Sequence, residues 1–307
     1  MTVISVNISE QRGVVKHPVA EIELNERGII GDAHAGSWHR QVSLLSSESI
    51  ERFAKKYDRQ FEPGVFAENI TTKGIDLGQV AILDRLIIGR VELEITQIGK
   101  KIHNKDFWIV SELDGCGLPT DGIFARVIKG GKIKSGSKIE LITRQLRFKI
   151  ITLSDRAYSG EYSDRSGPKI KEMLEDYFKS SRWYIEIINT VIPDDPVILR
   201  TELETARDDE IDVIITTGGT GIGPRDITPD VVIKMADKII PGIMDYIRMK
   251  HGAEYTNALI SRAVAGVMNQ SLIYTLPGSV RAVSEYMTEI LKTIEHIILM
   301  VHSIGHN

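Results

Sequence analysis

Two aspartates and a glycine-rich stretch are the residues of this chain with the clearest chemical potential. Asp194 ends an apolar segment, and Asp226 lies within "TTGGTGIGPRDITPD", residues 216–230. Free backbone N–H groups in such a stretch, next to a helix start, form a site for anions. Carboxylates beside a bound phosphate need a cation, and Mg²⁺ bound to a triphosphate takes one or two protein carboxylates. The pattern therefore predicts phosphate chemistry, with Asp194 and Asp226 as catalytic residues and as ligands of Mg²⁺.

Each part of this pattern also has a purely structural explanation. Glycine is the usual residue where a strand turns tightly into a helix, and a lone aspartate in such a turn commonly caps the helix or the turn. The stretch lacks the lysine of a Walker A sequence, and it is not a G-x-G-x-x-G motif on a first strand. The site hypothesis therefore depends on two carboxylates acting together beside the glycines.

The residues from 145 onwards predict the elements that position these groups. Apolar strands alternate with helices, which is typical of a mostly parallel sheet covered by helices. Asp195–Pro196 and Thr228–Pro229 each have the pattern of a helix cap followed by proline. Parallel sheets bind ligands at the carboxyl ends of their strands, so both aspartates are expected at one edge. The expected strands are 148–154, 183–194, 211–217 and 271–278, and one closing helix is expected over 279–302.

Residues 1–144 show a different pattern. Short β-branched segments separated by glycine turns predict a mainly β, barrel-like domain. One helix is expected over 46–57, begun by a serine cap, and a second, short helix is expected through 121–130. The only plausible boundary is 143–147, so the predicted domains are 1–144 and 145–307, held close together by a short connection.

Composition excludes several classes of protein. The 307 residues are 42% hydrophobic and 26% charged, with a net charge of -4, which is ordinary for a soluble chain of two domains. No apolar run reaches the roughly 18 residues of a membrane span, and the first residues lack a signal-peptide pattern, so a cytoplasmic protein is expected. Neither half is polybasic, which favours a small-molecule ligand over nucleic acid.

The second half resembles a known family. "TLSDRAYSGEYSDRSGP", "VIPDD", "TTGGTGIGPRDITPD", "LISRAVAG" and "LPGS" occur in the order found in MogA-like molybdopterin adenylyltransferases. The resemblance implies a three-layer α/β molybdopterin-binding fold, often trimeric, that transfers AMP from Mg-ATP to the terminal phosphate of molybdopterin and releases pyrophosphate. It implies Asp194 and Asp226 as the functional aspartates and a molybdenum-insertion enzyme as partner.

The resemblance also implies a set of substrate-binding positions. After the last strand, relatives commonly have Pro-Gly-Asn-Pro, whereas Gly278 is followed here by Ser279 and Val280, so the fixed proline turn is lost. The expected binding residues are Ser154, Asp155, Gly218, Gly219, Thr220, Gly221, Thr228, Pro229, Ser261, Arg262, Pro277, Gly278 and Ser279.

The first half resembles a stand-alone MOSC domain. The resemblance lies in "GIIGDAHAGSWHRQVSLLSSESI", "FAENITTKGIDL", "IGKKIH" and "GCGLPTDGIFARVIKGGKIKSG". It implies a β-rich module that binds the molybdenum cofactor or carries sulfur through a cysteine, which matches Cys116. A second family cysteine is replaced by Ile102 before His103, so no mechanism that needs two thiols is expected.

Metal ligation in the first half is not expected. Cys116 is the only cysteine, which excludes internal disulfides and zinc sites with several thiolates. Its glycine-flanked position leaves two alternatives, a buried small hydrophobe or an exposed thiol. Asp32, His34 and His39 in "GDAHAGSWHR" fit no zinc spacing, so a hydrogen-bonded loop is favoured there.

Both halves point to one pathway. The predicted function is molybdenum cofactor biosynthesis, with molybdopterin and Mg-ATP as substrates of the second domain and the pterin cofactor or sulfur bound by the first. The alternative comes from a different class, a non-catalytic protein that binds or carries the cofactor. The presence of both Asp194 and Asp226 favours the enzyme.

Overall fold

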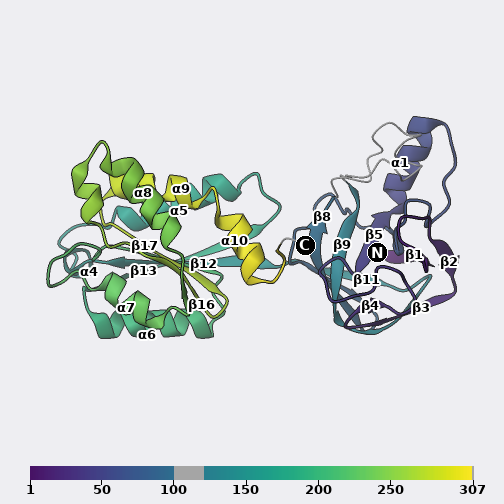
Figure 1. The fold of residues 1–307 in the computed structure, drawn as a ribbon, viewed down its shortest axis with the longest axis horizontal. Helices are drawn as coiled ribbons and strands as arrows, with labels where there is room; N and C mark the ends of the chain where they lie inside the picture. Colours follow the sequence, from purple (N-terminus) through teal and green to yellow (C-terminus); the bar gives the residue numbers. More distant parts are fainter. Residues whose placement is uncertain (100–120, 306–307) are drawn as a thin grey trace. The chain divides into compact units, whose positions relative to one another are not determined.

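The computed structural model describes residues 1–99 and 121–305, which form two compact units (Figure 1). The first unit is Met1–Arg144, and the second begins at Gln145. Within the described ranges, no helix is both long and apolar enough to cross a membrane.

The second unit is built on a six-stranded sheet. The first four strands in its order pair in parallel and the last two antiparallel, which confirms the prediction of an α/β fold with a mostly parallel sheet. The two antiparallel strands were not expected, because each is short. The strand order is β13 (Tyr184–Ile192), β12 (Gln145–Leu153), β14 (Val213–Thr217), β17 (Ser271–Leu276), β16 (Ala265–Met268) and β15 (Lys238–Ile239).

Helices cover both faces of this sheet and make three layers. Figure 1 shows α6 and α7 on one face and α5, α8 and α9 on the other. Leu199 and Leu203 of α6 are fully buried against the strands, which follows from their four-residue spacing on one helix face. The helices are α4 (Asp155–Tyr158), α5 (Ser166–Phe178), α6 (Pro196–Asp208), α7 (Thr228–Met235), α8 (Pro241–Gly252), the 3-10 helix η1 (Thr256–Ile260), α9 (Val280–Ile290) and α10 (Ile294–Val301).

Two predictions about these helices are wrong. The closing helix is interrupted between α9 and α10, where both the N–H and the hydroxyl of Thr293 donate to the carbonyl oxygen of Ile290, a local bonding pattern that competes with the helix. Thr228 does not cap α7. It is the first residue of that helix, and its hydroxyl donates to the carbonyl oxygen of Gly218 over 2.9 Å. Asp195, in contrast, caps α6 as expected.

The first unit is rich in sheet, as predicted. Its eight-stranded sheet is open, because the outermost strands β11 and β2 do not pair with each other, so the barrel-like arrangement is not confirmed. One isolated antiparallel bridge joins Thr2 to Lys138. The order is β11 (Ile139–Ile142), β7 (Arg85–Ile88), β8 (Val91–Ile98), β9 (Ile123–Lys129), β5 (Val42–Ser46), β6 (Ile70–Lys73), β1 (Thr2–Ile8) and β2 (His17–Val19).

A smaller sheet and one helix complete the first unit. Ser46 accepts a hydrogen bond from the backbone N–H of Ser49 and caps α1 (Ser47–Tyr57), as predicted. The short helix expected through 121–130 is wrong, because strand β9 occupies that segment and buries every second residue from Ile123. The smaller sheet has the order β10 (Gly131–Lys134), β3 (Glu21–Asn25) and β4 (Gly28–Ile29).

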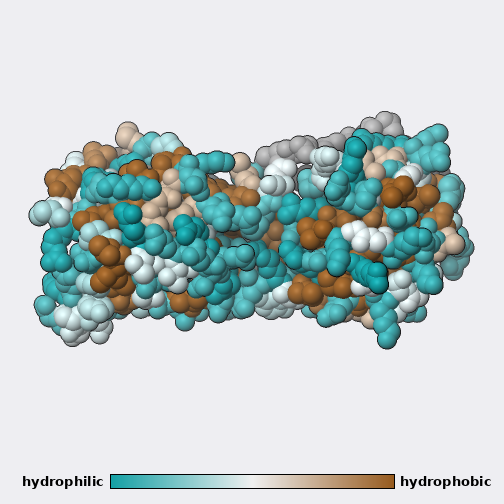
Figure 2. Space-filling model, turned by 90° about the horizontal axis from the view of Figure 1, so that it is seen from below, coloured by the Kyte–Doolittle hydropathy of each residue, from teal (hydrophilic) through white to brown (hydrophobic). Residues whose placement is uncertain are grey.

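The outer face of α6 and α7 is mixed in character. In Figure 2, which views the molecule from that side, hydrophobic side chains appear in small groups among hydrophilic ones. Val197 and Ile233 are exposed members of these two helices. Apolar atoms make up more than half of a typical protein surface, so scattered groups of this kind need no special explanation.

Candidate functional site

A pocket of about 240 Å³ lies at the carboxyl ends of β12, β13 and β14. These strands are neighbours and run parallel, so the residue that follows each one reaches the same edge of the sheet. Asp155, Asp194 and Asp226 come from the three successive connections. The lining consists of Leu153, Ser154, Asp155, Arg156, Asp194, Gly219, Arg225 and Asp226.

Asp155 and Asp194 hold each other in place. The backbone N–H of Asp155 donates to Oδ2 of Asp194 over 3.3 Å, and the N–H of Asp194 donates to Oδ1 of Asp155 over 3.1 Å. Burial raises the pKa of Asp194, and the negative charge of Asp155 adds to this, while the N–H of Asp155 and the Arg225 guanidinium oppose it. The pocket therefore disfavours a further uncompensated negative charge.

Asp226 is fixed by its own loop. Its Oδ2 accepts a hydrogen bond of 2.8 Å from the N–H of Gly223, so the carboxylate also has the turn-forming role that its position suggested. A Cβ on Gly221 would lie 2.6 Å from this same oxygen. The glycine at 221 therefore makes room for the carboxylate, which still lines the pocket.

Two other glycines of the loop are required by the backbone. Gly218 and Gly219 have φ values of 105° and 61°, in the region that favours glycine. A Cβ on Gly218 would lie 2.3 Å from the carbonyl oxygen of Leu153, and one on Gly219 would lie 2.6 Å from Oγ1 of Thr228. Close packing of the loop explains why residue 218 is a glycine. Gly219 is packed closely too, and its backbone also lines the pocket.

The expected Ser-Arg pair supports the loop from behind. The Arg262 guanidinium donates to the carbonyl oxygens of Gly221 and Asp226 and pairs with Asp230, and its backbone N–H donates to the carbonyl oxygen of Thr220. Ser261 accepts a hydrogen bond from the Arg248 guanidinium through its backbone carbonyl. The Arg262 contacts hold the glycine-rich loop in shape, and neither Ser261 nor Arg262 lines the pocket.

The structure brings part of the expected binding set together. Ser279 caps α9, and the carbonyl oxygen of Pro277 accepts a hydrogen bond from the Thr217 hydroxyl, so both have local structural contacts. Of the expected residues, five line the pocket: Ser154, Asp155, Asp194, Gly219 and Asp226. The others lie outside its lining: Gly218, Thr220, Gly221, Thr228, Pro229, Ser261, Arg262, Pro277, Gly278 and Ser279.

Sequence reasoning missed two arginines of the pocket. Arg225 forms an ion pair with Asp155 and so joins two of the three connections. The Arg156 guanidinium lies over the ring of Tyr162, 5.2 Å from its centre, and forms no ion pair with a carboxylate of the described residues. Each arginine is adjacent to a pocket aspartate in the sequence, which was the available signal. The pocket thus offers cations for a phosphate as well as carboxylates for a metal.

Metal ligation here depends on the substrate. Across the described ranges, no group of three or more His, Cys, Asp and Glu side chains is arranged to hold a metal ion. Asp194 and Asp226 supply carboxylate oxygens of the kind that Mg²⁺ prefers. Phosphate oxygens of the substrate and water would complete the coordination shell of the ion. The predicted Cys116, with Ile102 and His103, lies outside the described residues.

Comparisons with known proteins identify the family. Residues 149–296 match the model for "Probable molybdopterin binding domain", and residues 31–100 match that for "MOSC domain". The chain is 32% identical over 153 residues to molybdopterin adenylyltransferase from Helicobacter pylori, covering 50% of this chain and 85% of that protein.

Longer and solved relatives match the same half. The chain is 33% identical over 161 residues to molybdenum cofactor synthesis protein cinnamon from Drosophila melanogaster, which covers 52% of this chain but only 26% of that protein. The Mog protein structure from Mycobacterium ulcerans is 35% identical, covers 50% of this chain and 98% of its own, and has a TM-score of 0.47. The chain therefore belongs to the molybdopterin-binding family of molybdenum cofactor biosynthesis through its second unit, joined to a MOSC domain in its first.

Proposed function

We propose that the second unit is a molybdopterin adenylyltransferase, which transfers AMP from Mg-ATP to molybdopterin and releases pyrophosphate. The observation that carries this proposal is the convergence of Asp155, Asp194 and Asp226 with Arg156 and Arg225 at one strand edge. The relatedness to the Helicobacter pylori enzyme supports the same reaction. Phosphoryl-type transfer needs positioning and charge neutralisation more than a protein nucleophile, and this pocket supplies both.

The reaction balances without a covalent enzyme intermediate. An oxygen of the molybdopterin terminal phosphate attacks the α-phosphorus of ATP, the bond from that phosphorus to the bridging oxygen breaks, and pyrophosphate leaves. Arg156 holds the terminal phosphate, since its guanidinium has no carboxylate partner among the described residues. The N–H of Gly219 faces the triphosphate, and Arg225, which stays paired with Asp155, adds a second positive charge beside it.

Mg²⁺ fits the carboxylates of this pocket. Asp194 and Asp226 would hold it, because Asp155 is already engaged by Arg225 and by the backbone of Asp194. When bound, Mg²⁺ neutralises charge on the phosphates. A cation would stabilise the charged form of Asp194, which burial and the neighbouring Asp155 disfavour, as the raised pKa of Asp194 indicates. With Mg²⁺ bound, Asp194 and Asp226 would position the triphosphate next to the attacking phosphate.

The test is molybdopterin-dependent release of pyrophosphate from Mg-ATP. Asp226→Asn keeps an oxygen that can accept the Gly223 hydrogen bond but removes the charge, so it separates catalysis from folding of the loop. We expect a loss of about 10²- to 10³-fold in kcat, the usual effect of removing one electrostatic group. Asp208→Asn, at an exposed position near the end of α6, is the matched control. Binding of molybdopterin without pyrophosphate release would instead support a carrier.

The first unit is proposed to bind the molybdenum cofactor or to carry sulfur through Cys116. On the family resemblance alone, we also propose that the protein is a cytoplasmic trimer and that it works with a molybdenum-insertion enzyme. Mass spectrometry after incubation with a small-molecule persulfide, which transfers its outer sulfur to a thiolate and leaves as a thiol, tests the Cys116 role. A persulfide on wild type that is absent from Cys116→Ser supports sulfur transfer, and an unmodified thiol contradicts it.

A further inference from the structure

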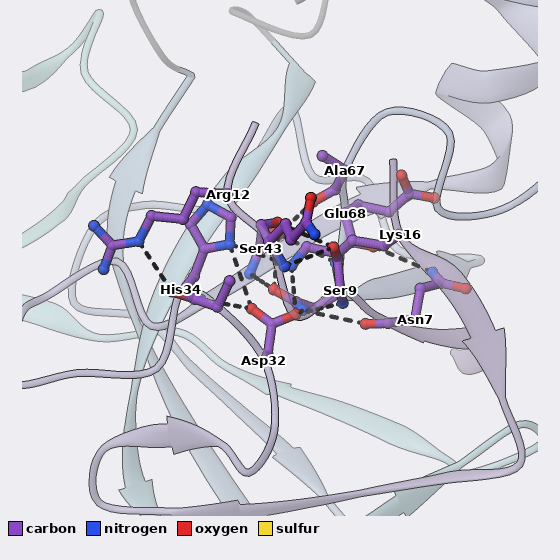
Figure 3. A network of polar contacts seen from close by, with 12 residues as sticks. Asn7, Ser9, Arg12, Lys16, Asp32, His34, Ser43, Ala67 and Glu68 are labelled. Atoms are coloured by element: carbon purple, nitrogen blue, oxygen red, sulfur yellow. Dashed lines mark hydrogen bonds and ion pairs between the residues drawn. The ribbon is translucent and has the colours of Figure 1, made fainter. Parts of the chain in front are cut away.

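A network of buried polar side chains lies beneath the loop 31–40 of the first unit (Figure 3). Oδ2 of Asp32 accepts hydrogen bonds from the N–H of Ser9, from Nζ of Lys16 over 2.5 Å and from Nδ2 of Asn69 over 3.0 Å. Its Oδ1 accepts from the N–H of His34 over 2.9 Å. The expected hydrogen-bonded loop is therefore present, and Asp32 is its centre.

The Lys16–Asp32 ion pair fixes this loop rigidly. The two side chains are 1% and 0% exposed. Burial by itself would raise the pKa of Asp32, but hydrogen bonds from His34 and Lys16 outweigh it and hold the pKa well below the ordinary value. A buried pair adds little net stability over apolar residues, yet losing one partner is costly, so such pairs specify a position. Here the ion pair fixes Asp32, which in turn holds His34 and the residues after it through the backbone N–H of His34.

An aromatic and cationic surface rests on this support. We call it the Trp38 surface; it consists of Arg12, His34, Trp38 and Arg40. Nε1 of Trp38 donates to the carbonyl oxygen of His34 over 2.8 Å, and the two rings lie nearly parallel. The guanidiniums of Arg12 and Arg40 lie 5.8 and 4.9 Å from the centre of the Trp38 ring. Two cations that are 28 residues apart in the sequence therefore contact one indole.

Neither guanidinium is neutralised by a carboxylate within the described ranges. Nε of Arg12 donates to the carbonyl oxygen of Ala33, which leaves its two terminal nitrogens available, while Nε of Arg40 is buried without a hydrogen-bond partner. Arg85 and Arg126 of the same unit, in contrast, both pair with Glu94. Two guanidiniums around one ring, neither paired with a carboxylate of the described residues, give this surface a positive charge that favours an anion.

We propose that Arg12 and Arg40 of the Trp38 surface bind the phosphate group of a small molecule. A carboxylate has two oxygens and is satisfied by one guanidinium, whereas a phosphate has three terminal oxygens and accepts from two. The rigid loop beneath holds the guanidiniums ready, which reduces the entropy lost on binding. The proposal rests on the proposed function only for the natural ligand, a phosphate-bearing pterin; binding of inorganic phosphate itself does not depend on it.

The test follows Trp38 fluorescence during titration of the full chain with inorganic phosphate. Trp108→Phe and Trp183→Phe leave Trp38 as the only tryptophan, so phosphate in the second unit is not detected directly. Arg12→Gln and Arg40→Gln should each weaken binding by about tenfold or more, and the double variant should abolish it. Arg59→Gln, at an arginine that lies over Phe61 in the same unit, is the control and should bind normally.

The outcomes separate this site from the adenylyltransferase. No saturable change, or an equal affinity in the double variant with its melting temperature preserved, overturns the site. Molybdopterin-dependent pyrophosphate release is measured on the same double variant and should be unchanged, because Arg12 and Arg40 belong to the first unit. Molybdopterin should bind more tightly than phosphate through the same arginines. If it binds no better, the phosphate site stands and the cofactor role of the first unit fails.

Discussion

The pocket of the second unit and the Trp38 surface of the first place charge in opposite ways. Three carboxylates dominate the pocket, and backbone N–H groups hold them together. On the Trp38 surface, two guanidiniums lie over an indole, and the Asp32 carboxylate of the supporting network pairs with Lys16. A phosphate can approach the Trp38 surface directly, but it needs a cation to approach the carboxylates of the pocket. Only the pocket is therefore expected to depend on Mg²⁺.

The largest expected effect concerns the support of the Trp38 surface. Lys16→Met leaves the buried Asp32 without its cation, so the free energy of unfolding of the first unit should fall by about 3 to 5 kcal/mol. Denaturant unfolding followed by Trp38 fluorescence, in the protein with Trp108→Phe and Trp183→Phe, measures this. Lys132→Met breaks the exposed pair with Glu21 and should change the free energy of unfolding far less, because solvent screens an exposed pair. Equal effects of the two variants would mean that the buried pair does not fix the loop.

The next largest expected effect is on substrate binding by Arg156, one of the two arginines of the pocket. Arg156→Gln should raise KM for molybdopterin by about tenfold or more, with a smaller change in KM for ATP and in kcat, since the lost contact is to the terminal phosphate. Arg207→Gln, at an arginine paired with Asp208 outside the pocket, is the control. A loss confined to kcat would contradict the assigned role of Arg156.

The smallest effect is a change in the pH dependence of stability. The pKa of Asp194 is raised by burial, so its protonated form favours the folded state. That stabilisation is complete below the ordinary aspartate pKa, about 3.9, and is lost as pH rises through the raised value. Asp194→Asn should therefore be slightly more stable than wild type near pH 7, while it loses activity. Thermal melting from pH 3 to pH 8 measures the difference, which should vanish at the acidic end; a variant less stable at pH 7 would refute it.

The strand edge that carries Asp194 and Asp226 could be predicted because alternating strands and helices determine where parallel strands end. The arginines of the pocket could not, since the pairing of Arg225 with Asp155 depends on how two separate loops approach each other. The Trp38 surface was missed for a similar reason, because Arg12 reaches Trp38 only through the fold.

Local patterns were informative where they were chemically specific. Asp195 followed by proline caps a helix as its sequence indicates, because a carboxylate at that position accepts from free N–H groups. Thr228 followed by proline looks alike, but its hydroxyl has a nearer acceptor in the Gly218 carbonyl and the helix begins one residue earlier. The segment of β9 was predicted as a short helix, but its burial alternates as in a strand.

The central claim, that the acidic pocket catalyses adenylyl transfer, is tested most directly by counting both products of one reaction. Wild-type protein is mixed with Mg-ATP and molybdopterin, and pyrophosphate and adenylylated molybdopterin are quantified together. One pyrophosphate is expected for each adenylylated pterin, and Asp226→Asn should form both products, still in equal amounts, about 10²- to 10³-fold more slowly. Pyrophosphate release that does not require molybdopterin, or that appears without the adenylylated pterin, would contradict it.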